Sequence, residues 1–299
     1  MIEASTKYIG RFAPSPTGPL HFGSLVAAVA SYLDARANGG DWLLRIEDID
    51  TSRCKAEFAN EFPAVLSAFG FAWNGEVLVQ SKRIQRYQEA FDRLAIMDQI
   101  YACSCSRREI ADSSLPGTDG LVYPGTCRCK GLAAAGNSQR IRTNADETCF
   151  RDRVQGRHCQ RIENDIGDFV LRRRDGLFAY QLAVVVDDAD QNISHVVRGA
   201  DLLDSTARQL YLQGLLGFRK PSYLHIPVVT NADGQKLSKQ TLAPMVSTAD
   251  ACRLLRDALR HLGQPDPAPE HDKPAALLKA AADAWSISFI PALRAIQGP

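Results

Sequence analysis

The chain has 299 residues, which is long enough for one large domain or two smaller ones. Its 35 lysines and arginines balance 34 aspartates and glutamates, so a formal charge of +1 excludes a global field that attracts nucleic acid or a membrane surface. The sequence has no N-terminal signal pattern and no apolar run of about 18 residues, which favours a cytoplasmic protein with no membrane partner.

The first elements predict an α/β fold with a parallel sheet. The patterns indicate a short strand over 7–12, a helix over 23–38 and a second strand over 42–49. The crossover of such a β-α-β unit joins parallel strands. Two further helices are expected over 53–68 and 81–98.

The middle of the chain is predicted to be irregular or built of strands. A Cys- and Gly-rich irregular segment is expected over 101–137, and short strands over 139–180 with a hairpin turn at Asp175-Gly176. The continuous β-branched run LAVVV at 182–186 predicts a strand that is covered on both faces.

The last third alternates helix, strand and helix. A helix is expected over 204–216, and PSYLHIPVV at 221–229 predicts a strand before the turn NADG and the segment KLSKQ at 236–240. Two tail helices are expected over 248–262 and 274–296, joined by a proline-rich linker.

The stretch RFAPSPTGPLHFGS at 11–24 lies between the first strand and the first helix. Free backbone N–H groups at a helix start favour anions, and a residue without a Cβ lets a phosphate or base approach the backbone. His21 and Gly23 stand at this junction, which indicates a nucleotide site. An ordinary loop with a capping or core histidine is the alternative.

The early stretch and the late KLSKQ together resemble the HIGH and KMSKS signatures of class I aminoacyl-tRNA synthetases. RFAPSPTGPLHFGSL and the following LLRIEDIDTSR are similar to the glutamyl branch of that class, and the resemblance covers roughly residues 7–245. It implies an α/β fold with a Rossmann-like, nucleotide-binding catalytic domain, an ATP-dependent ligase activity and glutamate as substrate. A nucleotidylyltransferase shares the histidine motif, but it does not account for RIED.

The shortened chain narrows this resemblance. About 54 residues follow Met245, too few for the long helical anticodon-binding region of a discriminating glutamyl-tRNA synthetase. Together with HFGS, KLSKQ and a cysteine pair, this resembles the glutamyl-queuosine tRNA(Asp) synthetase family. That family activates L-glutamate without tRNA, through glutamyl-adenylate, and transfers it to queuosine in the anticodon of tRNA(Asp). The alternatives are a shortened glutamyl-tRNA synthetase that charges a tRNA 3′ end, and a catalytically silent paralogue that binds RNA or glutamate.

The resemblance assigns an ATP site to the two signatures. Activation places negative charge on the α-phosphate and the departing pyrophosphate, so catalysis depends on positioning and on cations near those oxygens. The catalytic residues it implies are His21 and Lys239. The ATP-binding set, with Mg²⁺ arriving on the nucleotide, is Pro14, His21, Gly23, Ser24, Lys236, Ser238 and Lys239.

A glutamate pocket needs two cationic forks for two carboxylates and an anion for the ammonium group. Arg11 and Arg198 are candidates for the forks, and Glu47 for the anion, at the carboxyl end of a strand. Alternatively, Arg198 pairs with Asp201 or Asp204 and Glu47 only caps a strand. The set that the resemblance implies is Arg11, Phe12, Ala13, Pro14, Ser15, Glu47, Tyr180 and Arg198.

Four of the eight cysteines lie between residues 103 and 129, which indicates a metal site rather than disulfides. Zinc takes four tetrahedral ligands. The resemblance assigns one structural zinc ion to Cys103, Cys105, Tyr123 and Cys127, whereas the chemistry alone prefers Cys129 to a phenol. Free reduced cysteines remain the alternative. The others are expected to be ordinary thiols: Cys54, Cys149, Cys159 and Cys252.

These patterns divide the chain into four parts. Residues 1–100 and 166–245 are expected to form the two halves of the catalytic domain, 101–165 the zinc-containing insertion, and 246–299 a short helical C-terminal tail. Arginines within 151–161 and 172–174 either contact the phosphates of the tRNA(Asp) anticodon arm or form solvated faces. The enzyme is expected to be a monomer.

Overall fold

The computed structural model describes residues 7–298 except 115, 118–119 and 238–243. Its central feature is a parallel sheet. Strands β1 (Ile9–Phe12), β2 (Asp41–Ile46) and β3 (Leu78–Val79) pair in parallel, as do β11 (His195–Gly199) and β12 (Ser222–Ile226). The two groups meet where the Ser194 N–H donates to the Ile9 carbonyl and the Ile9 N–H donates to the Ser194 hydroxyl oxygen. The predicted α/β fold with a parallel sheet is confirmed.

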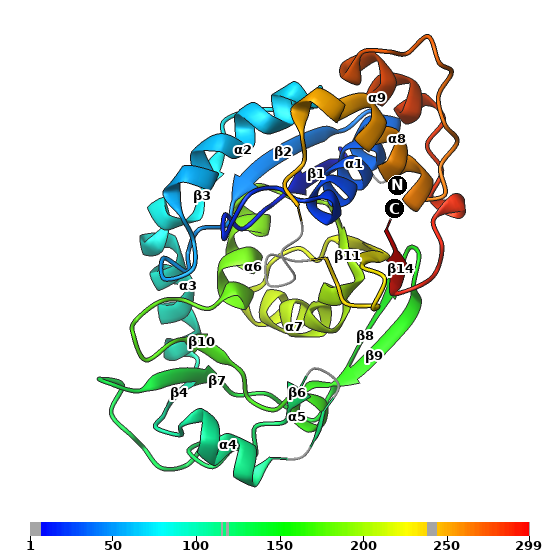
Figure 1. The fold of residues 1–299 in the computed structure, drawn as a ribbon. Helices are drawn as coiled ribbons and strands as arrows, with labels where there is room; N and C mark the ends of the chain where they lie inside the picture. Colours follow the sequence, from blue (N-terminus) through cyan, green and yellow to red (C-terminus); the bar gives the residue numbers. More distant parts are fainter. Residues whose placement is uncertain (1–6, 115, 118–119, 238–243, 299) are drawn as a thin grey trace, which may run out of the picture.

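Helices pack on both faces of this sheet (Figure 1). One face carries α1 (Phe22–Ala37), α2 (Ala56–Ala68), α8 (Ala251–His261) and α9 (Pro274–Asp283). The other face carries α3 (Ile84–Ile96), α6 (Tyr180–Asp190) and α7 (Thr206–Leu216). Alternate strand residues point to opposite faces, so Val197 joins the first core and Val196 packs with Leu210 of α7.

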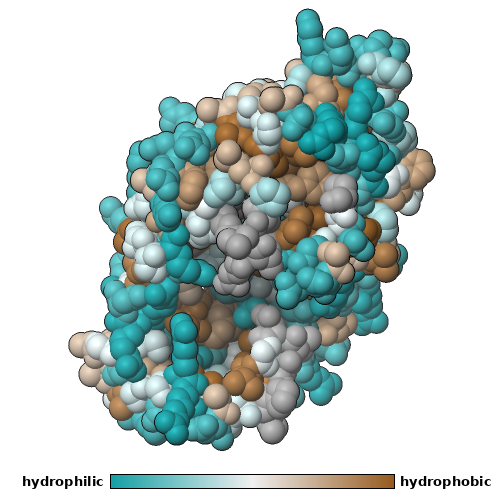
Figure 2. Space-filling model, viewed as in Figure 1, coloured by the Kyte–Doolittle hydropathy of each residue, from teal (hydrophilic) through white to brown (hydrophobic). Residues whose placement is uncertain are grey.

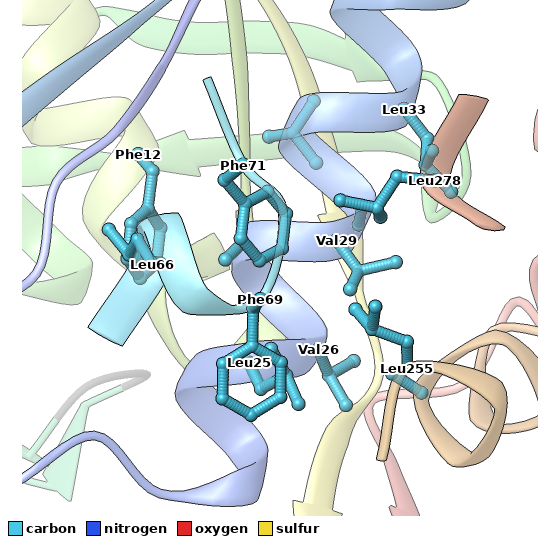
Figure 3. Close-up of a cluster of buried hydrophobic side chains, with 14 of the residues drawn as sticks. Phe12, Leu25, Val26, Val29, Leu33, Leu66, Phe69, Phe71, Leu255 and Leu278 are labelled. Atoms are coloured by element: carbon cyan, nitrogen blue, oxygen red, sulfur yellow. The ribbon is translucent and has the colours of Figure 1, made fainter. Parts of the chain in front are cut away.

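The core on the first face is built around α1. Figure 3 shows Leu25, Val26, Val29 and Leu33 of this helix, with Leu66, Phe69 and Phe71 on one side and Leu255 and Leu278 on the other. The tail helices therefore bury their apolar side chains against α1, the helix that follows His21. Among the described residues, no helix is long and apolar enough to cross a bilayer.

The predicted strand over 182–186 is wrong, because these residues lie inside helix α6. The helix is packed against α3, α7 and the sheet, and Leu182 to Val186 are all buried. A short apolar run looks the same in a helix buried on all sides as in a covered strand. Asp187 and Asp188 continue the buried segment, where they accept hydrogen bonds from arginines.

Residues 100–172 contribute a small antiparallel sheet, at the bottom of Figure 1. Its strands are β4 (Ile100–Cys103), β7 (Ser138–Ile141) and β10 (Val170–Arg172), so the sheet extends past residue 165. The same region contains α4 (Arg107–Ser113), α5 (Ile162–Asp165), β5 (Pro116–Gly117) and β6 (Gly120–Leu121). The turn at Asp175-Gly176 is confirmed by the antiparallel bridge between Arg172 and Phe178.

A hairpin of β8 (Glu147–Asp152) and β9 (Gly156–Arg161) extends from this region to the parallel sheet. Cys149 lies directly opposite Cys159 in the hairpin, and a disulfide joins them, with Cα atoms 4.1 Å apart. The expectation of ordinary thiols was therefore wrong for this pair. A separation of 10 residues in the sequence does not by itself indicate a disulfide. Antiparallel pairing in the folded hairpin brings the Cβ atoms of the two cysteines close enough to form one.

The tail is only partly helical, which corrects the prediction for 274–296. Helix α9 ends at Asp283, and β14 (Ala295–Gln297) pairs in parallel with β13 (Val228–Thr230). Pro291 lacks a backbone N–H and so disfavours a continuous helix here. The described part of the chain also contains four short 3₁₀ helices: Gln80–Lys82, Ala200–Ser205, Thr248–Asp250 and Ile287–Phe289.

Candidate active site

A cavity of about 1060 Å³ lies at the carboxyl ends of the parallel strands. Open parallel sheets bind their ligands at this edge. The cavity brings together every described residue of the two predicted sets: Arg11, Phe12, Ala13, Pro14, Ser15, His21, Gly23, Ser24, Glu47, Tyr180, Arg198 and Lys236. Figure 2, viewed as Figure 1, shows a face that is mainly hydrophilic at its edges, with apolar side chains between them.

The segment KLSKQ begins beside the start of α1. Leu237 N–H donates to the Val229 carbonyl at 2.7 Å, and beyond the segment Val246 N–H donates to the Leu20 carbonyl at 3.0 Å. Ser238 and Lys239 lie outside the described residues. Leu237 and Val246, on either side of residues 238–243, therefore both lie near the start of α1, although the two signatures are more than 200 residues apart.

His21 is the N-cap of α1. Its Nδ1 accepts a hydrogen bond from the Ser24 N–H at 3.2 Å, so the capping role that the sequence left open is present. The same ring lines the cavity. A Cβ on Gly23 would lie 3.2 Å from this ring and 3.8 Å from the Leu237 carbonyl oxygen, so the glycine leaves space between the two signatures.

Arg11 and Glu47 belong to a buried network of charges. Asp188 of α6 accepts hydrogen bonds from Arg11 Nε at 3.1 Å and from Arg45 at 2.6 Å. Arg45 Nε lies 3.4 Å from Glu47 Oε1, a contact whose geometry is too poor for a hydrogen bond. Burial raises the pKa of Glu47 to about 7, although Arg45 and Arg11 oppose the shift. Glu47 therefore lines the cavity, and its Oε1 on the side of Arg45 is buried without a hydrogen bond.

Arg198 does not pair with Asp201 or Asp204, as the alternative required. Asp201 pairs with Lys236, and Asp204 pairs with Arg294 at 2.7 Å. The Arg198 guanidinium instead donates to four neutral acceptors: His225 Nε2, Gln209 Oε1, Thr206 Oγ1 and the Leu202 carbonyl. It keeps a full positive charge at the wall of the cavity.

Sequence reasoning missed the residues that support this site. Asp188 and Arg45 lie behind Arg11 and Glu47, and His225 lies behind Arg198. The aspartates that follow LAVVV carried a signal, because a buried carboxylate requires a cationic partner. His225 carried no signal, since one histidine in an apolar strand is ordinary.

The predicted metal ligands also converge. The Sγ atoms of Cys103, Cys105 and Cys127 all lie within 4.8 Å of one another, and the Tyr123 hydroxyl is 3.3 Å from Cys103 Sγ and 3.9 Å from Cys105 Sγ. Cys129 is exposed and does not belong to this group. Tetrahedral zinc with bonds of about 2.3 Å requires sulfur atoms about 3.8 Å apart, so this set of donors fits the ion.

The backbone of Tyr123 is held in place by its contact with Gly167. It forms a bridge with Gly167, where an added Cβ would meet the Tyr123 carbonyl oxygen at 2.3 Å. The Arg140 guanidinium lies 3.8 Å from the centre of the Tyr123 ring. Burial and the hydrogen bond from Cys103 raise the pKa of the Tyr123 hydroxyl.

These features agree with comparisons to known proteins. A family model described as "tRNA synthetases class I (E and Q), catalytic domain" matches residues 8–260, so the chain belongs to this family and is a ligase. The crystal structure of glutamate-tRNA synthetase from Elizabethkingia anophelis has the same fold. The two share a TM-score of 0.79 and 22% sequence identity, over 98% of this chain and 68% of that one.

Relatives of greater sequence similarity carry a more specific name. A protein of Dechloromonas aromatica named Glutamyl-Q tRNA(Asp) synthetase is 56% identical over 287 residues, which cover 94% of this chain and 93% of that protein. The protein of that name from Chromobacterium violaceum is 53% identical, over 95% of this chain and 96% of its own length. The resemblance drawn from the sequence is confirmed.

Proposed function

We propose that the protein activates L-glutamate with ATP, without requiring tRNA, and transfers the glutamyl group to queuosine in the anticodon of tRNA(Asp). The observation that carries this proposal is that one cavity is lined by Arg11, Glu47 and Arg198 together with His21 and Lys236. Two cationic forks and a carboxyl match a molecule with two carboxylates and one ammonium group. The names of the relatives supply the acceptor.

In the first step, a carboxylate oxygen of glutamate attacks the α-phosphorus of ATP, and pyrophosphate leaves as the P–O bond to the β-phosphate breaks. His21 contacts the phosphates from the N-terminus of α1, where the helix dipole also favours an anion. Lys236 and Lys239 stabilise the charge that develops on the leaving group, assisted by Ser238. Mg²⁺ enters with the triphosphate, and Gly23 leaves room for the adenosine.

In the second step, a hydroxyl of the queuosine cyclopentenediol loses its proton to solvent as its oxygen attacks the glutamyl carbonyl carbon, and AMP leaves with the anhydride oxygen. Arg173 lines both the cavity and a neighbouring hollow of about 260 Å³ that Arg172 and Arg174 also line. We propose that these arginines, with those of 151–161, contact phosphates of the anticodon arm. The proposal includes a monomeric enzyme and the division into 1–100, 101–165, 166–245 and 246–299.

We propose one structural zinc ion, held by Cys103, Cys105, Tyr123 and Cys127. When bound, the ion clips the loop after β4 to the loop around Tyr123. Few apolar side chains surround this cluster, so a metal clip compensates for a small core.

The activation step is tested by glutamate-dependent exchange of label between pyrophosphate and ATP in the absence of tRNA. We expect exchange with L-glutamate and none with L-glutamine, which lacks the second carboxylate. A shortened glutamyl-tRNA synthetase would need tRNA for exchange. A silent paralogue would bind RNA or glutamate and show no exchange even with tRNA present.

A further inference from the structure

A buried chain of polar groups leads away from Arg198 to a part of the protein outside the cavity. Arg198 Nε donates to His225 Nε2 at 2.9 Å, and His225 Nδ1 lies 2.7 Å from Asp152 Oδ2. All three side chains are buried. Arg198 stands on β11, His225 on the adjacent β12, and Asp152 at the end of β8 in the hairpin.

The hydrogen bonds define which imidazole nitrogen carries the proton. Arg198 is a donor only, so His225 Nε2 must offer a lone pair to it, and the proton then stands on Nδ1 and is donated to Asp152. Burial and the Arg198 charge lower the pKa of His225 to about 4, so the ring is neutral near pH 7. Asp152 thus selects the tautomer that accepts from Arg198.

Asp152 is itself held rigidly. Its Oδ1 accepts the N–H groups of Val154 at 3.0 Å, Gln155 at 2.8 Å and His225 at 3.2 Å, which leaves Oδ2 for the imidazole. The carboxylate therefore faces His225 in one orientation only.

We propose that Asp152 and His225 are positioning residues for glutamate binding, because they hold the Arg198 guanidinium at the cavity wall through one imidazole tautomer. This inference rests on the proposed function. A neutral acceptor behind Arg198 orients it without neutralising it, so its charge remains available to a substrate carboxylate. Arg11 differs, because its direct partner is the Asp188 carboxylate.

Three substitutions test separately the hydrogen bond between Arg198 and His225 and the one between His225 and Asp152. In Asp152→Asn, the amide oxygen accepts the three backbone N–H groups, so the amide NH₂ points toward His225 Nδ1. Nδ1 must then accept a hydrogen bond, which moves the imidazole proton to Nε2. A proton on Nε2 faces the Arg198 N–H donor and removes the hydrogen bond between them. His225→Asn retains a group at the position of Nδ1 but no acceptor for Arg198. His225→Gln places an amide oxygen near the position of Nε2 and is the matched control.

The kinetic test measures pyrophosphate exchange. We expect Asp152→Asn and His225→Asn to raise the KM for glutamate about tenfold or more, with His225→Gln within about threefold of wild type. The KM for ATP should stay within about twofold, since Arg198 binds only glutamate in this account. Equal defects in all three variants, or an unchanged glutamate KM in Asp152→Asn and His225→Asn, would overturn the proposal.

A second measurement is independent of activity. In ¹⁵N-histidine-labelled protein, His225 of the wild type should show a protonated Nδ1 and an unprotonated Nε2, and Asp152→Asn should exchange the two. A wild-type ring protonated on Nε2 would refute the chain of bonds whether or not the enzyme activates glutamate. Wild-type protein with the expected tautomer but no glutamate-dependent exchange would refute the proposed function, and then the role in glutamate binding falls with it.

Discussion

Glu47 is surrounded by buried charges that affect its ionisation. Glu47 lies between Arg45, which is fully buried, and the cavity. Its other titratable neighbours are Arg11, Asp187, Asp188 and Tyr180. An ionised carboxylate in such a place is costly unless a cation joins it. The ammonium group of glutamate is such a cation, so substrate binding and Glu47 ionisation should be coupled.

We predict a pH dependence of glutamate binding from this coupling. With the pKa of Glu47 raised to about 7 by burial, the carboxyl loses its proton between about pH 6 and pH 8. The KM for glutamate should therefore fall as the pH rises through this range, by up to about tenfold. Glu47→Gln should have a high KM that does not vary with pH, whereas a wild-type KM that stays constant from pH 6 to pH 8 would count against this role.

At the scale of elements, helix α6 supplies the carboxylates that neutralise the arginines behind the cavity. Asp188 is buried between Arg11 and Arg45, whereas Asp190, two residues later, pairs with Arg83 and Arg86 near the surface. Burial alone would raise the pKa of Asp188, but the two neighbouring arginines lower it overall. Its contribution to stability is present above its unfolded-state pKa near 4 and is lost as the pH falls below that value.

Asp188→Asn should destabilise the protein by about 3 kcal/mol, because two buried guanidinium groups lose their common counter-charge. Asp190→Asn is the matched control on the same helix, and its cost should be below about 1 kcal/mol, since its pairs are partly solvated. Urea unfolding measures both. Equal losses in the two variants would contradict the distinction between the buried and the surface pair.

The cysteine cluster proposed to hold zinc is the second feature at this scale, and in it Tyr123 and Cys129 differ, because only Tyr123 lies beside the clustered thiols. Zinc analysis after dialysis should give one ion per chain for wild type and for Cys129→Ser, and little for Cys127→Ser. Tyr123→Phe should lose the ion to a chelator faster than wild type, because three ligands remain of four. Loss of zinc in Cys129→Ser, with full retention in Tyr123→Phe, would reverse the ligand assignment.

At the scale of the whole molecule, the sequence predicted the parts whose patterns are local. The β-α-β unit over 7–49, the loop before His21 and the cysteine spacing over 103–129 each indicate a structure within one continuous segment. Motif recognition also paired residues 11–24 with 236–240, and the anchoring of Leu237 and Val246 near α1 agrees with that pairing.

What the sequence could not predict depends on contacts between distant segments. Helix α6 was mistaken for a strand, because its burial comes from α3, α7 and the sheet rather than from its own pattern. Strand β14 forms because it pairs with the free edge of β13. Cys149 lies opposite Cys159 because of the register of the β8–β9 hairpin. The Asp152–His225–Arg198 chain joins three strands, and no spacing along the sequence indicates it.

The most direct test of the proposed function is to locate labelled glutamate after transfer. The enzyme is incubated with ATP, labelled glutamate and either tRNA(Asp) that contains queuosine or an unmodified transcript, and the label is mapped after nuclease digestion. The account predicts label on the queuosine-containing anticodon fragment and none on the transcript. Label on the 3′-terminal adenosine, in either RNA, would contradict it.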